Sequence, residues 1–235
     1  MQEDGLKLNA QKCKVTRLNT RREDKVMVGR EEVQDVKEFV YLGTTVTKEG
    51  CGTEDIEKRL RKARGAFFNL KKFWNTRSIG RNTKIKLFKT FVRPVLLYGC
   101  EAWKLTAAEE NKLDRFQLTC LRRILRIWWP QRICTDTISQ VTDVKKVSDE
   151  IRRRWYWIGH VIRKGRNGDC MVAMEWQPEG KRKVGRPKTT WSRTVEKESR
   201  RESWTRWAEV RGAAPDRASW REKVTALCAS WRGEN

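Results

Sequence analysis

The sequence predicts an α+β protein in which short N-terminal β-strands precede a mostly helical basic remainder. β-branched and aromatic residues cluster in the first fifty positions, whereas apolar residues beyond residue 53 recur at steps of three and four. Helix-capping residues stand in front of these apolar stripes. Strands followed by runs of helices are typical of the α+β class. We expect three parts, at residues 1–52, 53–130 and 131–235.

Three β-prone runs lie in the first part, at residues 12–18, 25–28 and 39–46. They are separated by charged or glycine-containing segments, which is the pattern of short strands joined by turns. So few strands are too little for a domain of their own, and we expect them to form the edge of a larger sheet.

Three helices are predicted in the second part. Thr53 is the expected N-cap of the first helix. Its apolar stripe consists of Ile56, Leu60, Ala63, Phe67, Leu70 and Trp74. The second helix begins at an Asn82 cap and is interrupted by Pro94, which has no backbone N–H. The third opens with a capping box formed by Thr106 and Glu109.

The third part is predicted to contain further helices around a basic loop. Ser148 is the expected cap of a helix through residues 151–162 that ends near Gly165. The loop covers residues 177–190, and helical stretches follow at about 191–210 and 216–231.

The charge distribution indicates an anionic partner. Lys and Arg number 53 against 30 Asp and Glu, a net charge of +23. Residues 1–50 are nearly neutral, whereas residues 51–150 and 151–235 each carry a net +11. Such an excess is typical of proteins that bind nucleic acid or a membrane surface. No apolar run approaches the roughly 20 residues of a membrane span, so we expect no membrane partner.

Catalytic and metal-binding patterns are missing from these 235 residues. The ten aspartates include no adjacent pair of the kind that two-metal phosphoryl transfer uses, so no catalytic residue is predicted. The seven cysteines are widely spaced, and His160 is the one histidine. This pattern predicts free thiols in an intracellular, reducing compartment, and neither a metal site nor a cofactor in this chain.

Several basic and aromatic residues are candidates for nucleic-acid contact. The basic residues of the first helix, Arg59, Arg61, Lys62 and Arg64, fall mostly off its apolar stripe, which predicts a basic face. Of these, Arg59 and Lys62 are the predicted contacts. Eight of the twelve tryptophans lie beyond residue 150, where they either stack on bases or fill the core. Trp157 lies off its helix stripe and is the best candidate for exposure, next to Arg152, Arg153 and Arg154.

A basic segment around a Gly-Arg-Pro sequence resembles an AT-hook, which lies extended in a narrow minor groove. The alternative is an ordinary solvated basic loop. Its basic residues are Lys181, Arg182, Lys183, Arg186 and Lys188.

An ordered series of motifs resembles one family, the non-LTR (LINE-type) retrotransposon reverse transcriptases. Two stretches are the most characteristic, F-V-Y-L-G at residues 39–43 and L-L-Y-G-C-E-A-W at residues 96–103. The remaining matches occur in the family's order, at residues 5–9, 12–14, 121–127, 157–163, 185–191 and 216–221.

The resemblance implies a role for each part. Residues 1–52 would be the end of the palm, with Tyr41, Leu42 and Gly43 in a hairpin like the primer grip. Residues 53–130 would be the thumb, and residues 131–235 a C-terminal nucleic-acid-binding region. Template–primer nucleic acid (an RNA–DNA hybrid, RNA or DNA) and the palm and fingers of the parent enzyme would be the partners, in the nucleus.

The family's aspartate hairpin, which would precede residue 5, does not occur in this sequence. We therefore expect a C-terminal fragment of an RNA-directed DNA polymerase that binds nucleic acid without catalysis, and the Mg²⁺ requirement would belong to the parent enzyme. The alternative is a free-standing, exapted DNA-binding protein that uses the Gly-Arg-Pro loop.

Overall fold

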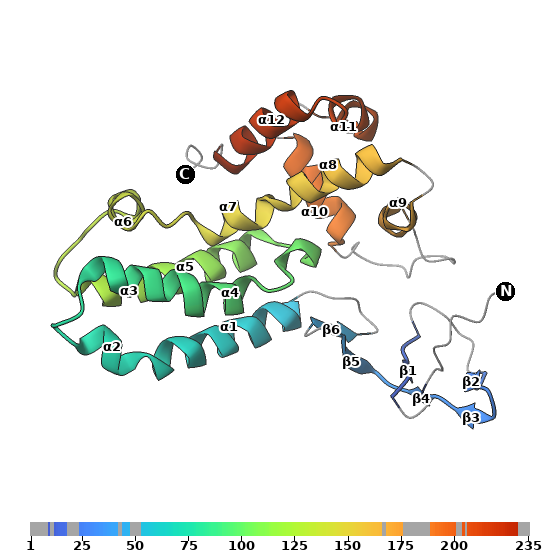
Figure 1. Ribbon diagram of the computed structural model, residues 1–235, viewed down its shortest axis with the longest axis horizontal. Coiled ribbons are helices and arrows are strands. Elements are labelled where there is room, and N and C mark those ends of the chain that lie inside the picture. The colour runs from blue at the N-terminus through green and yellow to red at the C-terminus, as the bar shows by residue number, and fades with distance from the viewer. Residues whose placement is uncertain are drawn as a thin grey trace. The chain divides into compact units, whose positions relative to one another are not determined.

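The computed structural model describes residues 9, 12–17, 24–41, 44–47, 53–165, 168–175, 189–200, 204 and 206–229 (Figure 1). The described residues form two compact units, the strands before residue 51 and the helices from residue 53 onward. Short strands followed by a predominantly helical chain confirm the predicted α+β class.

The described strands of the N-terminal unit are paired two by two. The pairs are β1 Lys14–Val15 with β4 Gln34–Asp35, β2 Met27–Val28 with β3 Glu31–Glu32, and β5 Glu38–Tyr41 with β6 Thr44–Thr47. The first pair is parallel, and the other two are antiparallel. Gly29, at φ +64°, supplies the left-handed conformation of the β2–β3 turn. The run predicted at residues 39–46 is a hairpin, whereas the polar β3 and β4 were not predicted because their residues have low β-propensity.

The described part of the helical unit consists mainly of α-helices, together with a π-helical turn and short 3-10 turns. In chain order these are α1 Thr53–Asn69, α2 Lys71–Asn75, α3 Arg81–Leu87, η1 Phe88–Val92, α4 Arg93–Leu97, η2 Cys100–Ala102, α5 Ala107–Leu125, α6 Thr135–Thr142, α7 Val147–Arg152, α8 Arg154–Lys164, α9 Asp169–Glu175, α10 Trp191–Ser199, α11 Trp207–Ala213 and α12 Arg217–Ala229. α1 packs on α4 and α5, and α12 packs on α7 and α8 (Figure 1). The helix predicted at residues 191–210 is therefore two helices, α10 and α11.

The apolar stripe of the first predicted helix is buried, but the helix is divided at Leu70. Ile56, Leu60 and Phe67 are core residues, as the stripe requires. Trp74 in α2 folds back on α1, where its Nε1 donates to the Phe67 carbonyl at 2.7 Å and its ring stacks on Phe67 at 4.9 Å between centroids. A continuous helix would use that carbonyl for the N–H four residues later. The indole therefore replaces a helical hydrogen bond with a side-chain bond and a ring contact.

Pro94 is accommodated by a π-helical turn. The helix begins after Gly80, its N-cap, and not at the predicted Asn82 cap. In η1 the Arg93 N–H donates to the carbonyl of Phe88, five residues earlier. Because Pro94 has no N–H, the regular helical ladder is interrupted here, and α4 starts with the proline in its first turn.

The capping box at the start of α5 is formed as predicted. The Glu109 N–H donates to Thr106 Oγ1 at 3.3 Å, and the Thr106 N–H donates to Glu109 Oε2 at 2.8 Å. The predicted Ser148 cap is wrong, because α7 begins at Val147 and the Ser148 hydroxyl donates to Asp114 on α5 at 2.8 Å. The Ser148 hydroxyl thus forms a tertiary hydrogen bond with α5, whereas the sequence spacing had predicted that it caps the helix.

Tryptophans form the core of the C-terminal helices. Trp155, Trp204 and Trp220 are buried, and the rings of Trp204 and Trp220 stack at 5.2 Å between centroids. Gly159 on α8 makes this possible, because a Cβ there would lie 2.3 Å from Trp220 Nε1. Close approach to α12 therefore explains a glycine inside a helix.

A chain of buried polar contacts joins this tryptophan core to the core built on α1 and α5. Trp103 Nε1 donates to Asp55 Oδ2 at 2.8 Å, and Arg154 Nη1 donates to the Trp103 carbonyl at 2.7 Å. The Arg154 guanidinium also donates twice to Glu198, at 3.2 and 2.6 Å. Trp155 Nε1 donates to the same carboxylate at 2.9 Å. Residues far apart in sequence are thus held in one network.

Candidate nucleic-acid interface

Several segments of the helical unit contain basic residues and no acidic ones. Residues 58–100 include thirteen basic residues, residues 115–135 include five arginines, and residues 151–168 include six basic residues. Eight of the thirteen are exposed, namely Arg61, Lys62, Arg64, Lys71, Lys72, Arg77, Arg81 and Lys86. Uninterrupted positive charge on helix surfaces is what a protein that contacts phosphates presents.

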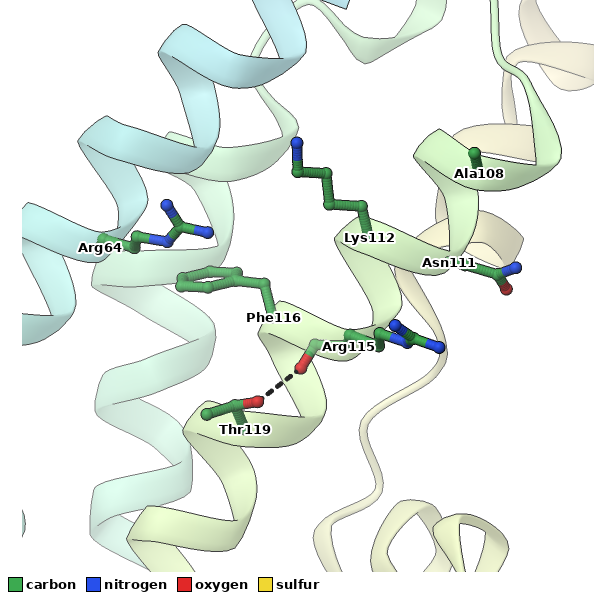
Figure 2. A pocket seen from close by; sticks show the side chains of 7 residues that line it. All are labelled: Arg64, Ala108, Asn111, Lys112, Arg115, Phe116 and Thr119. Carbon is green, nitrogen blue, oxygen red and sulfur yellow. Dashed lines mark hydrogen bonds between the residues drawn. The ribbon is translucent and has the colours of Figure 1, made fainter.

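Of these acid-free segments, residues 58–100 and 115–135 meet at a groove between α1 and α5. The groove has a volume of about 600 Å³ and is lined by Arg64, Ala108, Asn111, Lys112, Arg115, Phe116 and Thr119 (Figure 2). Figure 2 shows Arg64 on α1 directed toward the Phe116 ring, and Lys112 extending from α5 toward α1. Arg115 points away from α1 in this view. We call this site the α1–α5 groove.

The acidic side chains of α5 are turned away from this groove. Glu110 forms an ion pair with Arg152 on α7, with 2.9 Å between Glu110 Oε2 and Arg152 Nη2. Asp114 accepts hydrogen bonds from Ser148. Residues 110 and 114 are four apart and share a helix face, whereas residues 108, 112, 115 and 119 follow another. Packing on α7 thus holds Glu110 and Asp114 away from the groove, which Lys112 and Arg115 line.

One acidic residue reaches the groove from α1. Glu57 forms an ion pair with Lys112, and the hydrogen bond from Lys112 lowers the pKa of Glu57. The carboxylate therefore stays ionised and offsets the charge of Lys112. The charge of Arg64 also lowers the pKa of Glu57, but within the described chain neither Arg64 nor Arg115 forms an ion pair, so both guanidinium groups can bind an anion.

Aromatic side chains are exposed beside these cations. Phe68, one turn after Arg64 on α1, is 65% exposed, and Phe73 on α2 is also exposed. Lys71 Nζ lies 5.6 Å from the centroid of the Phe68 ring. Rings placed between cations can contact sugars or bases while the cations neutralise phosphates.

The structure separates the two residues predicted on the first helix. Lys62 is exposed on α1. Arg59 is buried, with its guanidinium carbon 4.5 Å from the centroid of the Tyr98 ring. The Arg59 side chain therefore packs inside the helical unit, and the exposed Arg61 and Arg64 take its place in the candidate surface.

The three arginines before Trp157 have different surroundings. Arg152 is buried and pairs with Glu110 and Asp149, and Arg154 is buried and pairs with Glu198. Buried, paired guanidinium groups cannot reach phosphates, so these two positions are corrected from surface contacts to core ion pairs. Arg153 is exposed, and its hydrogen bond to Glu150 raises its pKa.

Trp157 is 46% exposed on α8, where it lines a second cleft. This cleft has a volume of about 970 Å³ and also contains Tyr156, Met174 and Trp191. Glu101 and Glu150 lie among its lining residues, so its charge is mixed, and it shares no residue with the α1–α5 groove. The structure does not bring Trp157 together with Lys62.

The remaining candidates lie outside the described residues. These are Lys181, Arg182, Lys183, Arg186 and Lys188 of the Gly-Arg-Pro segment, together with Leu42 and Gly43. The backbone of Tyr41 is described as the end of β5, but its side chain is not.

The sequence places Arg64 on the basic face of the first helix but does not single out Arg115. A signal in the composition exists, because residues 58–100 and 115–135 contain no Asp or Glu, although residues 151–168 share this property. That signal marks the segments, but only the packing of α5 on α1 and α7 shows which basic residues share one surface.

No group of three or more His, Cys, Asp or Glu side chains in the described part of the chain is placed to hold a metal ion. None of the helices between residues 53 and 229, gaps aside, is long and apolar enough to cross a membrane.

The fold and this site define a basic, mostly helical α+β protein with a cationic groove. Its sequence is 30% identical over 239 residues to a transposon-derived protein of Caenorhabditis elegans, and the alignment covers 93% of this chain and 82% of that protein. The chain therefore belongs to this family of transposon-derived proteins. No protein-family model matches the sequence. No solved structure matches it either.

Proposed function

We propose that this chain is the thumb and C-terminal region of a non-LTR retrotransposon reverse transcriptase. Residues 1–52 would end the palm, residues 53–130 would form the thumb, and residues 131–235 would form the C-terminal nucleic-acid-binding region. The ordered motifs, above all the sequences at residues 39–43 and 96–103, support this proposal. Membership of a transposon-derived family agrees with it.

The biochemical function we infer is binding of a template–primer duplex at the α1–α5 groove, without catalysis by this chain. The observation that carries the inference is the meeting of two acid-free segments there, with Arg64 and Arg115 outside any ion pair in the described structure. Phosphates displace their counterions when they bind such residues, which drives association and makes it depend on salt. On this proposal the protein works inside the cell, in the nucleus.

The test replaces three exposed basic residues at or beside the groove. The variant Arg61→Gln, Arg64→Gln and Arg115→Gln removes three positive charges without touching the buried stripe. Binding of a labelled RNA–DNA hybrid is measured by fluorescence anisotropy between about 50 and 200 mM salt. If each residue contacts one phosphate, the slope of log K against log salt falls by roughly one per residue, about three in all.

A matched variant shows whether position matters or charge alone. Lys164, Arg217 and Arg221 are exposed on α8 and α12, and replacing all three by Gln removes the same total charge. The groove variant should lose much more affinity for the hybrid than this control. Equal losses of affinity from the two variants would show that binding depends on total charge and not on its position. The groove would then not be the interface. Equal binding of the wild type to anionic vesicles would favour a membrane surface instead.

The rival function is that of a free-standing DNA-binding protein that uses the Gly-Arg-Pro segment. Its variant is Arg186→Ala with Lys188→Ala, and its substrate is an A·T-rich duplex with a narrow minor groove. If the rival is right, this variant loses a preference for that duplex, and the groove variant binds it nearly as the wild type does. Under the reverse-transcriptase proposal, the loop variant weakens hybrid binding only by its share of general charge.

A further inference from the structure

Two adjacent tryptophans stand exposed on the loop that follows α5. Trp128 is 59% exposed and Trp129 is 90% exposed. An indole is the largest apolar side chain, and folded proteins normally bury most of it. Exposure of two neighbouring indoles therefore indicates a contact surface and not a part of the core.

The loop that carries them is held at both ends. The Ile127 N–H donates to the Arg122 carbonyl at 2.9 Å, and the Gln131 N–H closes a turn on the Trp128 carbonyl at 2.8 Å. Arg122 Nη2 donates across the loop to the Ile133 carbonyl at 3.2 Å. Ile127 and Ile133 pack against the core on either side of the tryptophans. The two indoles are thus presented on an anchored turn, so less conformational entropy is lost when they bind a partner.

The charges around the loop favour a polyanion, and not a neutral protein surface, as the partner of the two tryptophans. The two tryptophans lie in the acid-free segment 115–135, between Arg123 and Arg132, both of which are exposed. Arg126, at the start of the loop, donates to the Asn75 carbonyl at the end of α2 and so holds the loop against that helix. Trp157, the exposed indole of α8, shares its cleft with two glutamates and has no such setting.

We propose that Trp128 and Trp129 form a stacking platform for unpaired nucleobases, while Arg123 and Arg132 contact the adjoining phosphates. The ligand is single-stranded nucleic acid, free or as an overhang beside a duplex. This inference rests on the proposed nucleic-acid function and adds that the chain distinguishes unpaired from paired bases. Every base has a π-face, so the platform binds with little sequence preference.

The test uses the full chain with three variants at the two positions, both tryptophans being changed to Leu, to Ala or to Phe. Leu keeps most of the apolar area but has no π-face, whereas Phe keeps an aromatic ring. The probes are a labelled oligothymidylate, a blunt duplex, and the same duplex with a single-stranded overhang. We expect the Leu and Ala variants to bind the oligothymidylate and the overhang duplex at least about fivefold more weakly than the wild type. Binding of the blunt duplex should not change, and Phe should restore much of the loss.

The outcomes separate this inference from the proposed function. If the Leu variant binds the oligothymidylate as the wild type does, while the groove variant loses duplex binding, the platform is overturned and the proposed function stands. If the wild type binds none of the three probes, both fail. A change of oligomeric state in the Leu variant, measured by sedimentation, would show that the indoles cover a second copy and would also overturn the platform. The melting temperature should be unchanged in all variants, because neither indole is buried.

Discussion

Replacing Glu198 by glutamine should destabilise the helical unit by about 3–5 kcal/mol. The carboxylate is 5% exposed and accepts two hydrogen bonds from Arg154, whose side chain is fully buried. Glutamine has nearly the same shape but no charge, so the variant leaves a guanidinium in the interior without its counter-ion. Trp155 Nε1 donates to the same carboxylate and would lose part of that bond as well.

Thermal unfolding followed by circular dichroism measures this loss. For a chain of this length, 3–5 kcal/mol corresponds to a fall in Tm of about 6–20 °C. The matched control is Asp143→Asn, which removes a carboxylate that pairs with Lys89 at 3.2 Å and whose side chain is 96% exposed. Exposed pairs contribute about 0–1 kcal/mol, so the control should unfold within a few degrees of the wild type.

The difference in Tm between Glu198→Gln and Asp143→Asn tests whether the buried Arg154–Glu198 pair stabilises the helical unit. A Tm for Glu198→Gln within the range of the control would refute the claim that the Arg154–Glu198 pair links the two cores. A double variant, Arg154→Met with Glu198→Leu, should recover part of the lost stability, because a buried pair replaced by apolar side chains leaves no unpaired charge.

Three further predictions concern activity, thiol chemistry and packing. The purified chain should not extend a primer on an RNA template with Mg²⁺ and all four nucleotides, because its ten aspartates include no adjacent pair, and template-dependent product would contradict this. Burial raises the pKa of the Cys100 and Cys120 thiols to about 12, so at pH 8 iodoacetamide should modify the exposed Cys134 and leave these two intact. Mass spectrometry of the native protein measures this, and equal labelling of the three would show the assignment to be wrong. Gly159→Ala should cost about 1–3 kcal/mol in urea unfolding, because the new methyl would lie 2.3 Å from Trp220 Nε1, and a gain in stability would refute this close packing.

The sequence predicted the local features of the fold well where the signal lies within one helix. The Ile56–Phe67 stripe is buried, and the Thr106–Glu109 capping box forms, because both depend on residues three or four positions apart. The cap assigned to Ser148 and the unbroken helix through Leu70 were wrong. In both cases a group outside the local helical pattern forms the hydrogen bond. In the first it is Asp114, 34 residues from Ser148, and in the second it is the Trp74 indole, seven residues from Phe67.

The candidate interface, like the fold, was predicted in part from the sequence and decided in part by tertiary packing. Composition by itself determined that the chain is strongly basic beyond residue 50, and the motif order determined the family resemblance. Only the tertiary structure decided which cations are available. Arg59, Arg152 and Arg154 are buried, whereas Arg64 and Arg115 stand at a groove between helices. The physical reason is that spacing along a helix fixes which residues share a face, but what that face meets depends on helices from elsewhere in the chain.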